Sequence, residues 1–140
     1  MDIRIEYDCE HADWESVARI LQTVGMAHYA PEVHARAFQA SHTAVFLHDG
    51  ERLIGFGRAI SDGAYQAAIY DCAVLPEYQG HRLGSVIVEK ILERVEGCNV
   101  ILYAAPGKEG FYRKHGFGRM RTGMARFTAQ AVMREKEFVE

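Results

Sequence analysis

Cysteine is scarce in this sequence, and the few cysteines present form no framework. Cys9, Cys72 and Cys98 are odd in number, widely spaced and include no C-x-x-C pair. This pattern argues against a disulfide scaffold and against a zinc site, and it is typical of a reducing compartment. We therefore expect a cytoplasmic protein without a bound metal.

Long apolar runs and an excess of positive charge are also missing. No stretch approaches the roughly 20 apolar residues that span a bilayer, and residues 1–6 lack the basic and then apolar layout of a signal peptide. The formal net charge of -3 gives no general attraction for nucleic acid or an anionic membrane. We expect neither as a partner, so any anion site must be local.

Metal-ligand spacing is absent from the histidines as well. We expect most of the seven to lie on the surface; they are His11, His28, His34, His42, His48, His81 and His115.

Hydrophobic periodicity predicts strands and helices in one domain over residues 1–140. Asp13 is a suitable cap for a helix that ends near Gly25, and Pro31 is placed to begin a second helix. A third apolar stripe starts at Leu83. We expect strands over residues 3–6, 44–47, 52–60, 66–75 and 100–103, a short helix around 111–112, and one or two strands within 118–128. This order predicts an α/β fold with a mixed, mostly antiparallel sheet and helices on both faces.

The segment between the strand at 66–75 and the third helix is the most informative one. Its sequence, Gln79-Gly80-His81-Arg82-Leu83-Gly84-Ser85, is a glycine-containing turn that leads directly into a helix. The first amides of a helix lack intrahelical partners and lie at the positive end of its dipole, where they can hold a phosphate. Glycine lets a bulky anion approach the main chain closely. A second motif, Gly110-Phe111-Tyr112-Arg113-Lys114-His115-Gly116-Phe117, follows one further strand.

With both motifs in this order, the chain resembles the GCN5-related N-acetyltransferase superfamily. The turn is similar to that family's Q/R-x-x-G-x-G/A acetyl-CoA loop, with Gln79 and Gly84 in register and Arg82 in place of the usual middle glycine. Either this side chain crowds the turn or it adds a cation beside the phosphates, and we favour the second interpretation. The resemblance implies a sheet splayed at its central strands, of the acyl-CoA N-acyltransferase type.

The resemblance also assigns the acetyl-CoA contacts. The backbone of Cys72, Ala73 and Val74 would pair with the pantetheine arm in the gap between the splayed strands. The pyrophosphate would lie on the amides of the turn, which are those of Gln79, Gly80, His81, Arg82, Leu83, Gly84 and Ser85.

Catalytic roles are assigned on the same basis. Tyr112 matches the family tyrosine that protonates the departing thiolate; the alternative is a packed aromatic beside Phe111. Asp71 is the candidate base that deprotonates the amine, and the alternative is an ion pair with Arg58. Cys72 invites an acyl-enzyme hypothesis, but a free cysteine without an evident base usually behaves as a small buried hydrophobe.

The acceptor is expected to be a primary amine, more specifically a small molecule, attacked directly in a ternary complex. His28 and Tyr29 lie in the loop that borders the acceptor pocket in the resembled family, although an ordinary polar loop is the alternative. Two other functions remain open: acetylation of a protein lysine or N-terminus, and a non-catalytic acyl-CoA sensor. A homodimer is a further hypothesis, because an edge strand near Phe127 would need protection.

Overall fold

The computed structural model describes residues 1–140, which divide into two compact units. The first unit is Met1–Leu102 and the second is Tyr103–Glu140. The sequence predicted a single domain over the whole chain, and this stays a prediction. The first unit holds the sheet and the longer helices, and the second holds two short helices.

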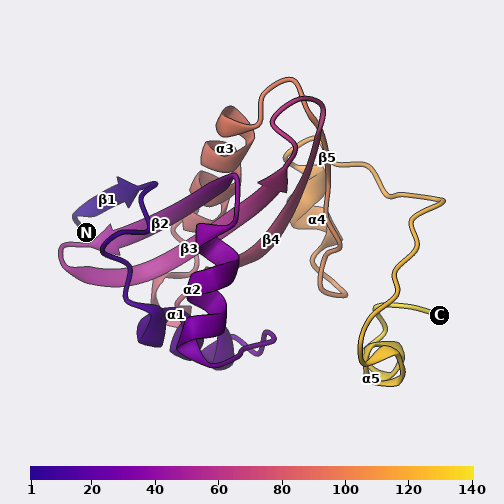
Figure 1. Ribbon diagram of the computed structural model, residues 1–140, viewed down its shortest axis with the longest axis horizontal. Coiled ribbons are helices and arrows are strands. Elements are labelled where there is room, and N and C mark those ends of the chain that lie inside the picture. Colours follow the sequence, from indigo (N-terminus) through magenta and orange to yellow (C-terminus); the bar gives the residue numbers. More distant parts are fainter. The chain divides into compact units, whose positions relative to one another are not determined.

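A five-stranded sheet forms the centre of the first unit (Figure 1). Its spatial order follows the sequence, from β1 to β5, with β1 to β4 antiparallel to their neighbours and β5 parallel to β4. The mixed, mostly antiparallel sheet predicted from the sequence is therefore confirmed. The strands are β1 (Ile3–Glu6), β2 (Thr43–Asp49), β3 (Arg52–Ser61), β4 (Gln66–Val74) and β5 (Asn99–Ile101).

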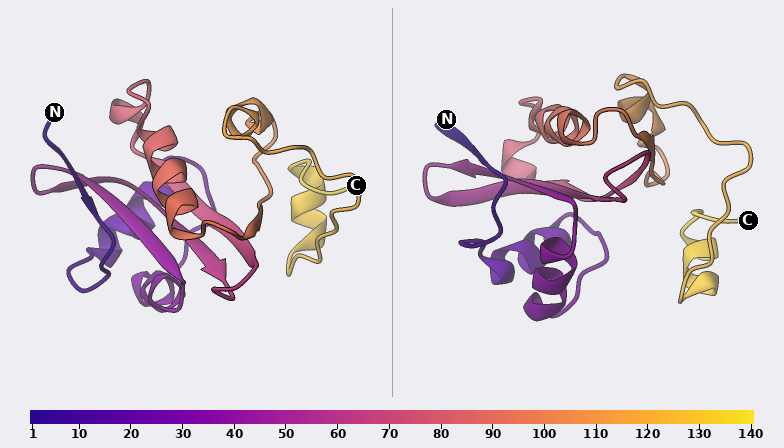
Figure 2. Two further views of the ribbon diagram at one scale, coloured as in Figure 1. Left: turned by 90° about the horizontal axis from the view of Figure 1, so that it is seen from above. Right: turned by 45° about the horizontal axis from the view of Figure 1, so that its top comes forward.

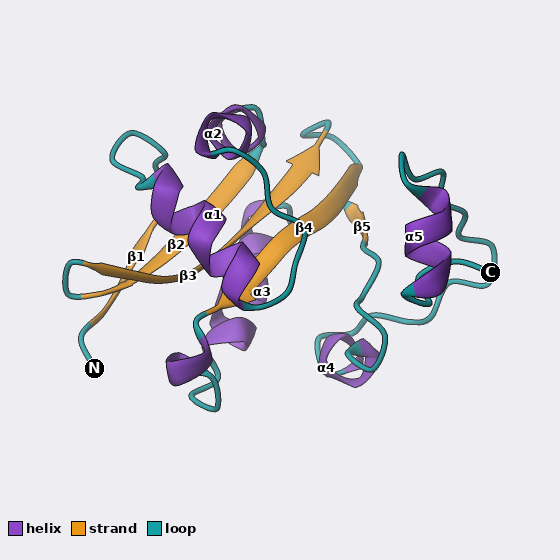
Figure 3. Cartoon of the chain, turned by 90° about the horizontal axis from the view of Figure 1, so that it is seen from below, coloured by secondary structure: helices purple, strands orange, loops and turns teal.

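Helices cover both faces of this sheet, as predicted (Figures 2 and 3). α1 (Trp14–Thr23) and α2 (Pro31–Gln39) lie on one face, and α3 (Leu83–Arg94) lies on the other. The side chain of Asp13 accepts the Ser16 amide at 3.2 Å and caps α1, because the first helical amides have no backbone partner.

An aromatic cluster fills the space between the sheet and α1 and α2. The Phe38 ring of α2 lies 5.6 to 5.7 Å from the rings of Trp14, Phe46 and Phe56. Edge and tilted arrangements of this kind add to the free energy gained by burying the rings. This packing holds the start of α1 and the end of α2 against β2 and β3.

The sheet opens on the far side of β4. β5 pairs with β4 only along Gln66, Ala67 and Ala68, whereas β4 continues to Val74. The rest of β4 therefore presents one row of main-chain groups with no strand beside it, which is the splay predicted from the resemblance. β5 differs from the predicted strand at 100–103 in its bounds, because it runs from Asn99 to Ile101, and Ile101 is 49% exposed.

The second unit corrects another prediction. It contains α4 (Glu109–Arg113) and α5 (Gln130–Glu135), and no strand forms between residues 118 and 128. The Gln130 amide group accepts the Phe127 amide at 2.7 Å and donates to the Ala125 carbonyl at 3.3 Å. It thus occupies a donor and an acceptor that strand pairing would use. The dimer hypothesis loses the edge strand near Phe127 that motivated it.

Candidate functional site

The glycine-containing turn has the local geometry expected of an anion-binding loop. A short 3-10 helix, η1 (Pro76–Tyr78), follows β4, and Gly80 then takes a left-handed conformation with φ 88°. A Cβ at Gly80 would meet nothing within 4 Å, so its main chain is accessible. The first bond of α3 runs from the Val86 amide to the Arg82 carbonyl at 3.1 Å. The amides of Leu83 and Gly84 come before that bond, in the part of a helix whose N–H groups lack intrahelical partners.

Arg82 explains why this position is usually glycine in the resembled family. It caps α3 from the left-handed region, with φ 63° and ψ 19°, where an L side chain costs about 1–2 kcal/mol. The turn keeps its conformation despite the missing glycine, and the Arg82 side chain is exposed. The side chain therefore does not crowd the turn. Its role as a cation beside the phosphates stays a prediction.

Side chains tie the turn to the neighbouring strands. Gln79 donates from Nε2 to the Val74 carbonyl at 3.0 Å, which joins the turn to the end of β4. The Tyr78 hydroxyl donates to Asp49 Oδ2 at 2.6 Å. This bond lowers the pKa of the Asp49 carboxyl and raises the pKa of the Tyr78 phenol. An ion pair at 2.9 Å between Arg52 and Glu77 adds a second link from the β2–β3 hairpin to η1.

A β-bulge bends β4 a few residues beyond the stretch that pairs with β5. The register with β3 shifts between Phe56 and Arg58, and Asp71 takes a left-handed conformation with φ 57°. Asp71 Oδ2 accepts Arg58 Nε at 2.7 Å, and both side chains are largely buried. The ion pair with Arg58, which was the alternative role for Asp71, is therefore present. The role of Asp71 as a base stays a prediction.

Cys72 points to the opposite face of the sheet from Asp71. Its Sγ lies 2.8 Å from where a Cβ of Gly57 would stand, and Ile87 of α3 approaches the same point. The glycines of β3 thus allow close packing of α3. Burial raises the pKa of Cys72 to about 12, so the thiolate needed for an acyl-enzyme is scarce.

The loop before α2, residues 26–30, is called the acceptor-side loop below. His28 and Tyr29 are both exposed, and Tyr29 is 60% exposed. The Tyr29 amide donates to Nε2 of His34 at 2.8 Å, and the two rings lie 5.6 Å apart. Sequence reasoning missed His34, which is buried and only 3% exposed. His34 lies four residues before Phe38, so both share one face of the helix. This spacing was the signal from which the burial of His34 could have been predicted.

Tyr112 belongs to the second unit. It lies in α4, where its ring contacts those of Phe111 at 5.0 Å and Phe117 at 5.9 Å. The packed aromatic cluster given as the alternative is therefore present. Whether Tyr112 is also the acid stays a prediction.

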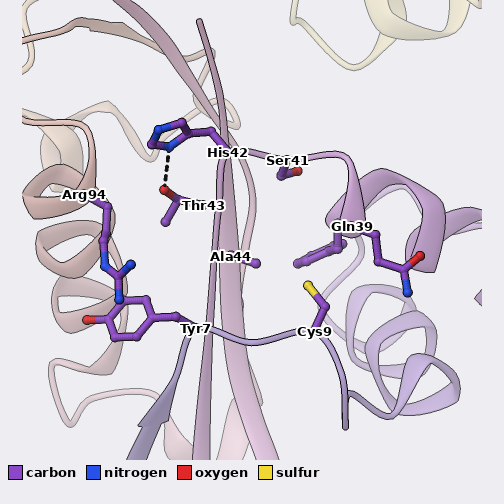
Figure 4. A pocket seen from close by; sticks show the side chains of 9 residues that line it. Tyr7, Cys9, Gln39, Ser41, His42, Thr43, Ala44 and Arg94 are labelled. Carbon is purple, nitrogen blue, oxygen red and sulfur yellow. Dashed lines mark hydrogen bonds between the residues drawn. The ribbon is translucent and has the colours of Figure 1, made fainter. Parts of the chain in front are cut away.

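A pocket lies at the other end of α3 from the turn (Figure 4). Arg94 of the last helical turn stacks on Tyr7 at 3.7 Å, and His42 Nδ1 contacts Thr43 Oγ1 at 2.9 Å. α3 has 12 residues and is about 18 Å long, so this pocket is separate from the turn. Its lining comprises Tyr7, Cys9, Phe38, Gln39, Ser41, His42, Thr43, Ala44 and Arg94.

Two further features bear on the expected partners. The structure contains no group of three or more His, Cys, Asp or Glu side chains placed to hold a metal ion. None of its helices combines the length and the apolar composition that crossing a membrane would require.

Comparison with known proteins identifies the family. The model of the Acetyltransferase (GNAT) family matches residues 7–117, and the chain belongs to this family. A solved structure of similar fold comes from meticillin-resistant Staphylococcus aureus, a protein of unknown function described as a probable acetyltransferase. It is 32% identical, with a TM-score of 0.77, and the match covers 89% of this chain and 98% of that one.

Two curated relatives are similar over most of this chain. An uncharacterized N-acetyltransferase of Porphyra purpurea, ycf52, is 31% identical over 116 residues, which are 81% of this chain and 62% of the relative. Serotonin N-acetyltransferase 2, chloroplastic, of Oryza sativa subsp. japonica is 33% identical over 113 residues, 75% of this chain and 56% of the relative. The chain thus spans less than two thirds of the length of either. Because the rice relative is named chloroplastic, the cytoplasmic location stays a prediction.

Proposed function

We propose that this protein is an acetyl-CoA-dependent N-acetyltransferase that acetylates a primary amine by direct attack in a ternary complex. One observation carries the proposal: in this chain of the GNAT family, the end of β4 leads directly into the turn before α3. The stretch of β4 from Cys72 to Val74 has β3 on one side and no strand on the other, and Gln79 links the Val74 carbonyl to the turn before α3.

These features fit the two ends of acetyl-CoA. The open side of this stretch of β4 suits the amides of a pantetheine arm, because an extended segment can add to an exposed strand. The turn offers an accessible Gly80 and the first-turn amides of α3, which suit a pyrophosphate. Arg82 would add a positive charge at the same place.

A small amine is the acceptor that we propose. The rice relative is named a serotonin N-acetyltransferase, which supports an amine of that size for the present chain. His28 and Tyr29 expose an imidazole and a phenol on the acceptor-side loop, where they are available to an incoming amine.

Proton transfer is needed at both reacting groups. An alkyl amine with an ordinary pKa near 10.4 must lose a proton before it attacks, and the departing thiolate must gain one. We assign the second step to Tyr112. For the first step, Asp71 would act through its carboxylate while Arg58 holds it in place at 2.7 Å. Holding the amine beside the thioester would supply much of the rate.

A thiol-release assay tests the proposal. The full chain is incubated with acetyl-CoA and each of a panel of amines that includes serotonin, polyamines, amino acids, aminosugars and lysine-containing peptides. Thiol release with small amines supports the proposal. Thiol release with peptides alone would instead indicate an enzyme that acetylates proteins. Binding of acetyl-CoA in a calorimeter without release from any amine would indicate a sensor.

A charge placed in the turn tests the coenzyme site separately. Gly84→Asp introduces bulk and negative charge among the first-turn amides of α3, so acetyl-CoA affinity should fall about tenfold or more. Gly118→Asp is the matched control, because it adds the same charge at a glycine with nothing within 4 Å of a Cβ. Equal affinities of the two variants in calorimetric titration would refute the assigned site.

A further inference from the structure

His34 is the one buried histidine of the chain, and it faces the candidate acceptor region. It lies one turn into α2 and is 3% exposed, and its Nε2 accepts the Tyr29 amide at 2.8 Å. Its ring also contacts the Tyr29 ring at 5.6 Å. Through these two contacts, the buried His34 side chain holds Tyr29 near the end of an exposed loop.

We infer that neutral His34 is a positioning residue, which holds the acceptor-side loop in place through the Tyr29 amide and releases it when the imidazole is protonated. The role of the loop in amine binding rests on the proposed function. The hydrogen bond and its dependence on protonation are independent of the proposed function.

The direction of the hydrogen bond determines the protonation state of His34. An amide N–H only donates, so Nε2 must carry its lone pair and the single proton of the neutral ring lies on Nδ1. Protonation would turn Nε2 into a donor that faces another donor. Because His34 is buried, water cannot readily take over the bond, and either the ring or the loop must move.

The charged neighbours of His34 come from three elements. Asp71 of β4 favours the protonated ring, whereas Arg58 of β3 and His28 of the loop disfavour it. Burial is the largest influence, and together these effects lower the pKa of His34 below its usual 6.5. The ring is therefore neutral at pH 7.5. Its contribution to stability is fully present above pH 6.5 and is lost as the pH falls through the lowered pKa of the folded state.

Nuclear magnetic resonance of the full chain, labelled with ¹³C and ¹⁵N, tests this directly. At pH 7.5 we expect a ¹⁵N–¹⁵N coupling across the hydrogen bond between the Tyr29 amide and His34 Nε2. As the pH is lowered, the coupling should disappear and the exchange of the Tyr29 amide with water, corrected for its intrinsic pH dependence, should rise about two- to tenfold. Both changes should follow the titration of the His34 ring.

Two substitutions separate the hydrogen bond from the shape of the side chain. His34→Gln keeps an acceptor near the position of Nε2 but cannot titrate, so Tyr29 should stay protected at every pH. His34→Phe keeps a ring but removes the acceptor, so Tyr29 should exchange rapidly even at pH 7.5. His11→Gln, at an exposed histidine, is the matched control and should behave like the wild type.

The inference is overturned if the coupling is absent while the ring is neutral, or if Tyr29 exchange does not change as the ring titrates. The wild-type titration decides the matter even if His34→Phe fails to fold. A kinetic arm uses the acceptor that the thiol-release panel identifies. There, His34→Phe should raise KM for the amine, His34→Gln should restore it, and acetyl-CoA affinity should stay constant. Absence of thiol release with an intact coupling would refute the proposed function alone.

Discussion

Adding a single methyl group at Gly57 should destabilise the first unit and disturb β4. A Cβ at this position would lie 2.7 Å from Ile87 Cγ2, 2.8 Å from Cys72 Sγ and 3.1 Å from Ile91 Cδ1. All three distances are shorter than ordinary carbon contacts, so α3 or β4 must move away from β3. Overpacking of this kind costs about 1–3 kcal/mol. We therefore expect the free energy of unfolding of Gly57→Ala to fall by that amount.

Urea denaturation followed by circular dichroism measures the effect. With a typical dependence of about 2 kcal/mol per molar urea, the midpoint should fall by about 0.5–1.5 M. Acetyl-CoA affinity should fall as well, because the displaced Cys72 lies on the stretch of β4 beyond β5 where the coenzyme is proposed to bind. Gly118→Ala is the control: its Cβ meets nothing within 4 Å, so its midpoint should be unchanged or slightly higher. A wild-type midpoint for Gly57→Ala would refute the close packing of α3 on this strand.

Three further predictions concern the candidate site. Arg82→Ala should weaken acetyl-CoA binding in calorimetry only modestly, and more at low salt than at high salt, because Arg82 is an exposed cation; a loss independent of salt would contradict this role. Tyr112→Phe should lower turnover by up to about 10²–10⁴-fold with little change in acetyl-CoA affinity, and full turnover would mean that another group protonates the thiolate. Cys72, with a pKa of about 12, should resist iodoacetamide at pH 7.5 in the folded protein, and prompt labelling by peptide mass spectrometry would show that its thiolate is accessible.

Most elements of the first unit could be predicted because their signals are local. Asp13 caps α1 and Pro31 lies in the first turn of α2, as their side-chain chemistry suggests. Gly25 and Gly97 take positive φ values just after helices, where the chain must reverse. The turn before α3 was found for the same reason, since its glycine and the helix that follows are adjacent in sequence.

The remaining features depend on contacts between distant residues. Residues 118–128 have enough apolar character for a strand, but a strand needs a partner, and Gln130 satisfies part of that backbone instead. β5 is exposed because it lies at the sheet edge, which its apolar composition does not reveal. The hydrogen bond from Tyr29 to His34 and the bulge at Asp71 also arise only when the loop and the sheet are assembled.

Backbone strain is concentrated at the candidate site. Three residues other than glycine have a positive φ, and two of them, Asp71 and Arg82, lie at the bulge of β4 and at the turn before α3. Each conformation costs about 1–2 kcal/mol for an L residue and persists only where the surroundings enforce it. Asp71 is held by Arg58 at 2.7 Å, and Arg82 is held between the turn and the first bond of α3. The contacts that enforce these two conformations therefore also align the end of β4 with the first-turn amides. These contacts thus hold in place the continuous stretch of main chain along which the coenzyme is proposed to lie.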